Sequence, residues 1–302
     1  KIAGIAIPIT IGAAMMPIGN VVDSSIVMTR LLEAGLDRTT AESLFGQLTG
    51  FASPIVQFPL VLIQAIVVSL VPMVAASNKL GDKHELHNNI SLGVRMTSII
   101  TIPASVGLFV LAEPVLLLLY SSQRASAISA APCLQILAVG FIFLAALTIF
   151  TGALQGLGKQ GIPVRNLFIG VIAKLVLTWV LTAIPSINVM GAAIGTISAY
   201  AVAAVLDFLA LIKYSGVKLS VKMTLIKPFI SAIVMGIVVF AGYKVLFMIL
   251  GSNGTATLLS VFVGVAVYGI MVLKTKTIEK EEMMTISIGR KIAKICDKLR
   301  LW

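Results

Sequence analysis

The chain has 302 residues, of which 58% are hydrophobic and only 12% are charged, and its mean hydropathy is +1.05. Water-soluble domains are roughly 45–50% apolar and about 25% charged, so this composition excludes an ordinary soluble fold. The net charge of +11 would suit a nucleic-acid partner only if basic and aromatic residues clustered on one face, but here the basic residues are scattered between apolar runs. Cys133 and Cys296 lie in unlike segments and indicate neither a disulfide framework nor a metal site.

Eight apolar stretches are long enough to cross a bilayer, since a helix needs about 20 residues to span the hydrocarbon core. The first follows Lys1 without an initiator methionine and continues to Leu32, so we interpret residue 1 as a position inside a longer chain rather than the start of a signal peptide. The predicted spans cover residues 5–30, 48–76, 92–112, 131–157, 163–184, 190–212, 228–250 and 256–273. The predicted fold class is all-α, a polytopic membrane helix bundle of about eight transmembrane helices.

The Lys and Arg side chains separate between alternate connections. Of the 23, seventeen fall near the connections after the second, fourth and sixth spans or in the tail. These are Lys79, Lys83, Arg95, Lys159, Arg165, Lys213, Lys218, Lys222, Lys227, Lys274, Lys276, Lys280, Arg290, Lys291, Lys294, Lys298 and Arg300, whereas only Arg30, Arg38, Arg124 and Lys244 fall on the opposite side. Cytoplasmic loops carry the excess of cations. We therefore predict a multi-pass protein of the cytoplasmic membrane with both ends of this segment cytoplasmic.

The tail, residues 274–302, is the largest polar segment. Its apolar residues recur at helical spacing, while the cations occupy the other faces; the apolar set is Ile288, Ile292, Ile295, Leu299 and Trp302. This pattern predicts a basic amphipathic helix that lies on the inner leaflet.

Three ionisable side chains, Asp23, Lys174 and Asp207, lie inside predicted spans. A charge in hydrocarbon costs several kcal/mol, so such groups face the bundle interior with a partner or water. We expect Lys174, near the middle of its span, to contact one of the aspartates or a substrate anion. A purely structural ion pair is an equal alternative.

Uncharged polar residues recur on single helix faces. Candidates for lining a hydrophilic cavity are Asn20, Gln57, Gln64, Thr151 and Gln155, although hydrogen bonding between helices explains them equally well. In the sixth span Gly191, Gly195, Ala199 and Ala203 form a small-residue stripe at steps of four, which predicts close helix packing.

Motifs for bond chemistry are missing from the sequence. It contains no GxxxxGK[ST] phosphate loop, no GxSxG and no HExxH, and its loops lack the clustered acids that hold Mg²⁺ against a pyrophosphate. We therefore assign no catalytic residue, metal or cofactor and predict a transporter rather than an enzyme. An integral membrane transferase acting on polyprenyl phosphate and a scaffold for wall synthesis remain as less favoured alternatives.

Four segments carry a family resemblance. They are GFASPIVQFPLVLIQAIVVSLVPMVAAS, ISLGVRMTSIITIPASVGLFVLAEPVLLLLY, LQILAVGFIFLAALTIFTGALQGLGKQGIPVRN and VMGAAIGTISAYAV. Together they resemble the carboxyl-terminal portion of stage V sporulation protein B-like polysaccharide-biosynthesis flippases, in the multidrug/oligosaccharidyl-lipid/polysaccharide exporter superfamily. The resemblance covers residues 1 to about 273.

The resemblance implies two six-helix lobes around a central cavity that work by alternating access. Residues 1–213 would then be the second lobe, 214–273 two additional transmembrane helices and 274–302 the cytoplasmic tail, with a missing amino-terminal lobe ahead of Lys1. The implied partners are membrane lipids and the substrate, an undecaprenyl-pyrophosphate-linked oligosaccharide that serves as a cell-wall, spore-cortex or polysaccharide precursor. A cation-coupled multidrug antiporter of the same superfamily is the alternative.

Family members of the lipid II type hold a sodium ion with residues of the second lobe, and Asp23 matches the acidic member of that site. Lys174 departs from the pattern, because it brings a positive charge where a cation site needs oxygen. Na⁺ and H⁺ both remain candidate coupling ions, with Lys174 as a tethered substitute for the ion near Asp23 or Asp207. Arg95 and Arg165 are the candidates for binding the pyrophosphate, although both also satisfy the positive-inside rule.

Overall fold

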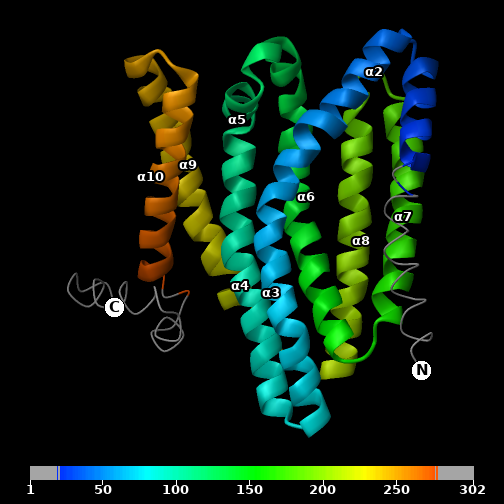
Figure 1. The fold of residues 1–302 in the computed structure, drawn as a ribbon, viewed down its shortest axis with the longest axis vertical. Coiled ribbons are helices and arrows are strands. Elements are labelled where there is room, and N and C mark those ends of the chain that lie inside the picture. Colours follow the sequence, from blue (N-terminus) through cyan, green and yellow to red (C-terminus); the bar gives the residue numbers. More distant parts are fainter. Residues whose placement is uncertain (1–18, 20, 276, 278–302) are drawn as a thin grey trace.

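The structure is a computed structural model that describes residue 19, residues 21–275 and residue 277. This part of the chain is a bundle of long helices with no strand among its residues (Figure 1). Residues 21–33 are helical. The labelled elements are α2 (Arg38–Gly46), η1 (Gln47–Ala52), α3 (Ser53–Leu80), α4 (Lys83–Val110), α5 (Ala112–Leu119), η2 (Ser121–Gln123), α6 (Arg124–Gly156), α7 (Gly161–Thr182), α8 (Met190–Ser215), η3 (Lys222–Ile226), α9 (Lys227–Leu250) and α10 (Asn253–Lys274).

Seven segments of the described chain are long and apolar enough to cross a membrane, and they correspond to the second through eighth predicted spans. Of the first predicted span, 5–30, only residue 19 and residues 21–30 are described, and these are helical. The predicted amphipathic tail falls almost wholly outside the described residues, as do Lys1, Asn20 and Cys296. Many large apolar side chains face outward, including Phe58 and Met248, which are 83% and 85% exposed. Such a surface suits lipid rather than water.

The second predicted span begins ten residues earlier than expected, because Asp37 caps α2. Its carboxylate accepts hydrogen bonds from the Thr40 backbone N–H at 3.0 Å, from the Thr40 hydroxyl at 2.6 Å and from the Thr39 hydroxyl. These donors hold the pKa of the exposed Asp37 carboxyl well below its usual range. The π-helical turn η1 then joins α2 to α3, with Ser53 Oγ donating to the Leu48 carbonyl at 2.8 Å.

Other boundaries also differ from the prediction, since α4 begins at Lys83 and the third span was expected to begin at residue 92. The fourth span was expected to begin at residue 131, but α6 begins at Arg124 and is 33 residues long. The short helix α5 occupies a stretch to which no element was assigned. Composition alone does not locate these ends, because apolar residues continue across the turn between α4 and α5.

The connections lie at the two ends of the bundle as the alternating pattern predicts. The turns α3–α4, α6–α7 and α8–α9 lie at the lower end in Figure 1, and the turns α7–α8 and α9–α10 lie at the upper end. The lower turns carry the larger group of described Lys and Arg residues. Which end faces the cytoplasm remains a prediction.

Close packing of α7 on α8 depends on glycines. A Cβ on Gly170 would lie 2.5 Å from the Ala199 carbonyl oxygen, and one on Gly195 would lie 2.3 Å from Thr178 Oγ1. One on Gly191 would lie 2.6 Å from the Thr182 nitrogen. The small-residue stripe of the sixth predicted span is therefore confirmed as a packing surface.

Candidate functional site

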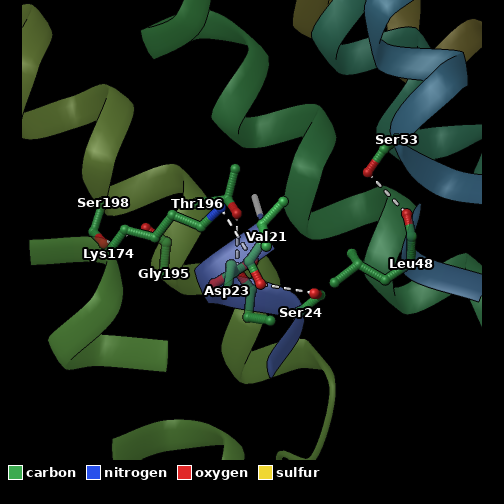
Figure 2. Close-up of polar contacts among 10 residues, drawn as sticks. Val21, Asp23, Ser24, Leu48, Ser53, Lys174, Gly195, Thr196 and Ser198 are labelled. Carbon is green, nitrogen blue, oxygen red and sulfur yellow. Dashed lines mark hydrogen bonds and ion pairs between the residues drawn. The ribbon is translucent and has the colours of Figure 1, made fainter. Parts of the chain in front are cut away.

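A buried ion pair joins the helix at 21–33 to α7. Lys174 Nζ lies 3.1 Å from Asp23 Oδ2, and the two side chains are only 11% and 10% exposed. Figure 2 shows the Lys174 side chain reaching Asp23 alongside Gly195 and Thr196 of α8. The contact expected between Lys174 and one of two aspartates is thus present, and Asp23 is the partner. Its role in transport stays a prediction.

The ion pair uses only one of the two carboxylate oxygens of Asp23. Asp23 Oδ1 is buried and has no hydrogen-bond partner in the described chain. A buried acceptor without a partner costs about 1–3 kcal/mol, more when it is charged. The site therefore has spare acceptor capacity for a proton, a water or a cation beside the lysine.

Arg30 holds the same two helices together two turns further along. Its Nε donates to the Trp179 carbonyl at 3.0 Å, its guanidinium lies 4.5 Å from the centre of the Trp179 ring, and it pairs with Glu33. Asp23 contacts Lys174, and Arg30, which is later in the first helix, contacts Trp179, which is later in α7. The contacts therefore advance together along both helices, which means that the two helices run in the same direction. These contacts fix where Asp23 meets Lys174.

A second polar cluster lies between α6, α7 and α8. Asp207 is fully buried and accepts hydrogen bonds from Asn166 Nδ2 and Thr151 Oγ1, both at 2.8 Å. Arg165 in turn donates to Asn166 Oδ1 at 3.2 and 3.4 Å from its exposed side chain. This chain of contacts connects a surface cation to a buried carboxylate.

Asp207, Thr151 and Arg165 were predicted from the sequence to have separate roles in ion coupling, cavity lining and pyrophosphate binding. In the structure, hydrogen bonds through Asn166 join them in one cluster. Asn166 is one turn before Gly170, where α7 packs closely on α8, and its amide reaches the Asp207 carboxylate. The sequence feature that could have indicated Asn166 is a single amide side chain within the apolar helix α7. The two clusters are separate: Asn166 and Lys174 are eight residues apart, about 12 Å along α7.

The remaining candidates lie apart from both clusters. Gln57 and Gln64 are exposed on α3, Gln155 is exposed near the end of α6, and Arg95 is partly buried on α4. Within the described residues, the three glutamines make no hydrogen bond to Asp23, Lys174 or Asp207. Their expected cavity and pyrophosphate roles remain predictions. The described residues contain no group of three or more His, Cys, Asp or Glu side chains placed to hold a metal ion.

A large apolar cavity was not predicted from the sequence. It has a volume of about 810 Å³ and is lined by α3, α4, α5, α9 and α10. Its two tyrosine hydroxyls are engaged, since Tyr120 donates to the Gly50 carbonyl and Tyr268 to that of Ile99. No sequence pattern marks it, because its walls have the same apolar composition as the surfaces that face lipid or pack between helices.

Long apolar helices that bury a charge pair and a carboxylate between them define a multi-span membrane protein. The chain belongs to the MurJ family: the family description "Lipid II flippase MurJ" matches residues 4–262. The resemblance to flippases expected from the four sequence segments is thereby confirmed.

Two relatives from Bacillus subtilis (strain 168) agree with this. The chain is 28% identical to "Lipid II flippase MurJ" over 239 residues, covering 78% of this chain and 43% of the relative. It is 24% identical to "Stage V sporulation protein B" over 269 residues, covering 88% of this chain and 50% of the relative. The chain therefore spans about half the length of these curated relatives.

Two solved structures share the fold. A lipid II flippase MurJ in an inward closed conformation has a TM-score of 0.59 at 15% identity, covering 88% of this chain and 51% of that one. An outward-facing multidrug resistance MATE family transporter of the MOP superfamily has a TM-score of 0.56 at 17% identity, covering 95% of this chain and 67% of that one. At these identities the likeness shows the fold alone, so the MATE neighbour gives the antiporter alternative little weight.

Proposed function

We propose that this chain forms one lobe of a flippase that moves an undecaprenyl-pyrophosphate-linked oligosaccharide across the cytoplasmic membrane by alternating access. Family membership over residues 4–262 carries the proposal. The substrate class follows from relatives whose names describe a lipid II flippase and a sporulation protein. Because these relatives are about twice as long, we include in the proposal a second lobe that completes the central cavity.

The division into parts belongs to the same proposal. Residues 1–213 would form the six-helix lobe and 214–273 two additional helices, α9 and α10. In support, α9 and α10 pack against each other at the side of the bundle away from α7 (Figure 1), and α9 meets the lobe mainly at α4. We assign the lower, basic end of Figure 1 to the cytoplasm because the positive-inside rule favours it.

The substrate's two chemical parts suit different parts of the chain. The 810 Å³ cavity has apolar walls suited to a prenyl chain, and Arg165 presents an exposed guanidinium to the basic end, where a pyrophosphate would enter. The Asp23–Lys174 pair is our candidate for the coupling site, with H⁺ or Na⁺ as the ion that competes with the lysine for Asp23. No bond is made or broken in this scheme.

A proteoliposome assay tests the proposal. The protein, with whatever sequence flanks it in its own gene product, is reconstituted with lipid II, and an external enzyme cleaves only the molecules that reach the outer leaflet. We expect faster cleavage than in protein-free liposomes. Transport of a cationic drug with no acceleration of lipid II movement would overturn the proposal in favour of the antiporter.

Two glycine variants test the role proposed for the apolar cavity lined by α3, α4, α5, α9 and α10. Gly269 lines the cavity and Gly242 does not, while a Cβ at either position meets nothing within 4 Å. Gly269→Phe should fill the cavity and reduce photo-crosslinking by a polyprenyl lipid, and Gly242→Phe should leave it unchanged. Equal crosslinking in both variants would remove the cavity from the proposal.

A further inference from the structure

A second cavity lies under the linker between α8 and α9. Its volume is about 370 Å³, and it is enclosed by α4, α6, α8 and residues 217–225. This is within the range of roughly 300–1,000 Å³ typical of small-molecule sites. None of the residues discussed above for transport lines it. Its lining includes Ile212, one turn before the end of α8, and α8 ends at the lower end of the bundle in Figure 1.

Two hydroxyls in the wall of this cavity lack partners. Thr97 and Thr101, one turn apart on α4, are 3% and 2% exposed, and neither Oγ1 has a hydrogen-bond partner within the described residues. Their neighbour Ser98, also in the wall, donates to the Val94 carbonyl at 3.1 Å. Since a buried hydroxyl is normally hydrogen-bonded, Thr97 and Thr101 need an acceptor that the described residues do not supply.

The rest of the wall is apolar with one cation. Lys218 lines the cavity, together with apolar side chains such as Ile149, Phe150 and Phe208. Residues 213–227 contain four lysines and no acidic residue, so this rim attracts anions. A molecule that satisfies all three features has an acyl chain, acceptor oxygens and a negative headgroup.

Contacts at the end of α8 hold Lys218 over the cavity. A ring nitrogen of His87, Nε2, is hydrogen-bonded to the Ser215 carbonyl at 2.7 Å, which ties α8 to α4. The Val217 backbone N–H donates to Ser215 Oγ at 3.1 Å, which fixes the start of the linker. Thr224, buried in the cavity wall, closes the other end of the linker.

We propose that this cavity binds one anionic phospholipid from the leaflet at the basic end of the bundle. The phosphate lies against Lys218, the ester oxygens accept hydrogen bonds from Thr97 and Thr101, and an acyl chain follows the apolar wall. The bound lipid fastens the α8–α9 linker, and with it α9, to the six-helix part of the bundle. This site does not depend on which molecule the protein transports.

The test is lipid binding by the purified full chain in phosphatidylcholine nanodiscs that contain phosphatidylglycerol, with bound lipid counted by native mass spectrometry. Lys218→Gln should lower the preference for phosphatidylglycerol about fivefold, the loss of one lysine–phosphate attraction near a membrane surface. Lys222→Gln, in the same linker but outside the cavity wall, is the matched control and should leave the preference unchanged. Equal losses in both variants would reduce the effect to general surface charge and overturn the proposal.

A photoactivatable phosphatidylglycerol provides a second readout that does not need the variants to be equally stable. We expect crosslinks in α4, α6 and the linker, diminished by Thr97→Val combined with Thr101→Val but not by Ser98→Ala. Excess phosphatidylglycerol should compete, whereas inorganic phosphate and phosphatidylcholine should not. Crosslinks spread evenly over lipid-facing residues such as Met248, or competition by lipid II in place of phosphatidylglycerol, would overturn the proposal.

Discussion

Removing one member of the Asp23–Lys174 pair should destabilise the protein much more than removing both. At a separation of 3.1 Å and an effective dielectric constant of about 20, the attraction is about 5 kcal/mol. Desolvation of two ions costs several kcal/mol each, so the intact pair contributes little net stability. Lys174→Met leaves the Asp23 carboxylate buried without its cation, and this should lower the free energy of unfolding by about 3–5 kcal/mol.

The measurement is a double-mutant cycle on unfolding in detergent. Asp23→Asn combined with Lys174→Met removes both charges and should recover most of the stability lost in Lys174→Met. Lys244→Met, at an exposed lysine of α9, is the control and should change stability by no more than about 0.5 kcal/mol. The reasoning is refuted if Lys174→Met is as stable as the parent, or if the double variant is no more stable than Lys174→Met.

The double variant also separates the two roles left open for the pair. A stable double variant that moves lipid II at the parent rate would make the pair purely structural. A stable double variant that no longer moves lipid II would support a role for the pair in coupling. The predicted differences in unfolding free energy do not depend on whether the chain is a flippase.

Three further predictions concern other sites. Asn166→Ala removes one of the two donors to the fully buried Asp207 and should cost about 1–3 kcal/mol in the same unfolding assay; Gln155→Ala, at an exposed amide on α6, is the control, and equal effects would argue against the network. Gly170→Ala places a methyl group 2.5 Å from the Ala199 carbonyl oxygen and should lower the free energy of unfolding by about 1–3 kcal/mol. In the control Gly242→Ala, the added methyl group meets nothing within 4 Å and should not destabilise the protein. A Gly170→Ala variant as stable as the parent would show that α7 and α8 are not this closely packed. Because the folded-state pKa of Asp37 is lowered, its contribution to the α2 cap is present above the unfolded value of about 3.9 and is lost as pH falls toward the lowered one. The carboxyl ¹³C shift of Asp37 should titrate well below 3.9, and Thr39→Val with Thr40→Val should raise that pKa; no change would contradict the assigned donors.

The apolar runs predicted seven of the described helices because the hydrocarbon thickness sets a minimum span length that any such sequence must meet. Helix ends were less well predicted. The start of α2 at Arg38 depends on the Asp37 cap, and α5 depends on a turn within an apolar stretch. The spans were located by hydropathy, and neither the cap nor the turn produces a change in hydropathy that would mark a helix end. The four segments that carry the resemblance indicated the family that matches residues 4–262.

The sequence by itself determined that the chain crosses a membrane, which residues carry charge inside it, and that the sixth span has a small-residue face. Each follows from local composition and period, which the solvent selects directly. Only the tertiary structure decided that Lys174 pairs with Asp23, that Arg165, Asn166, Asp207 and Thr151 form one chain of contacts, and where the two cavities lie. The physical reason is that a helix fixes spacing along its own axis, whereas rotation and depth relative to its neighbours are set by how side chains from distant segments pack together.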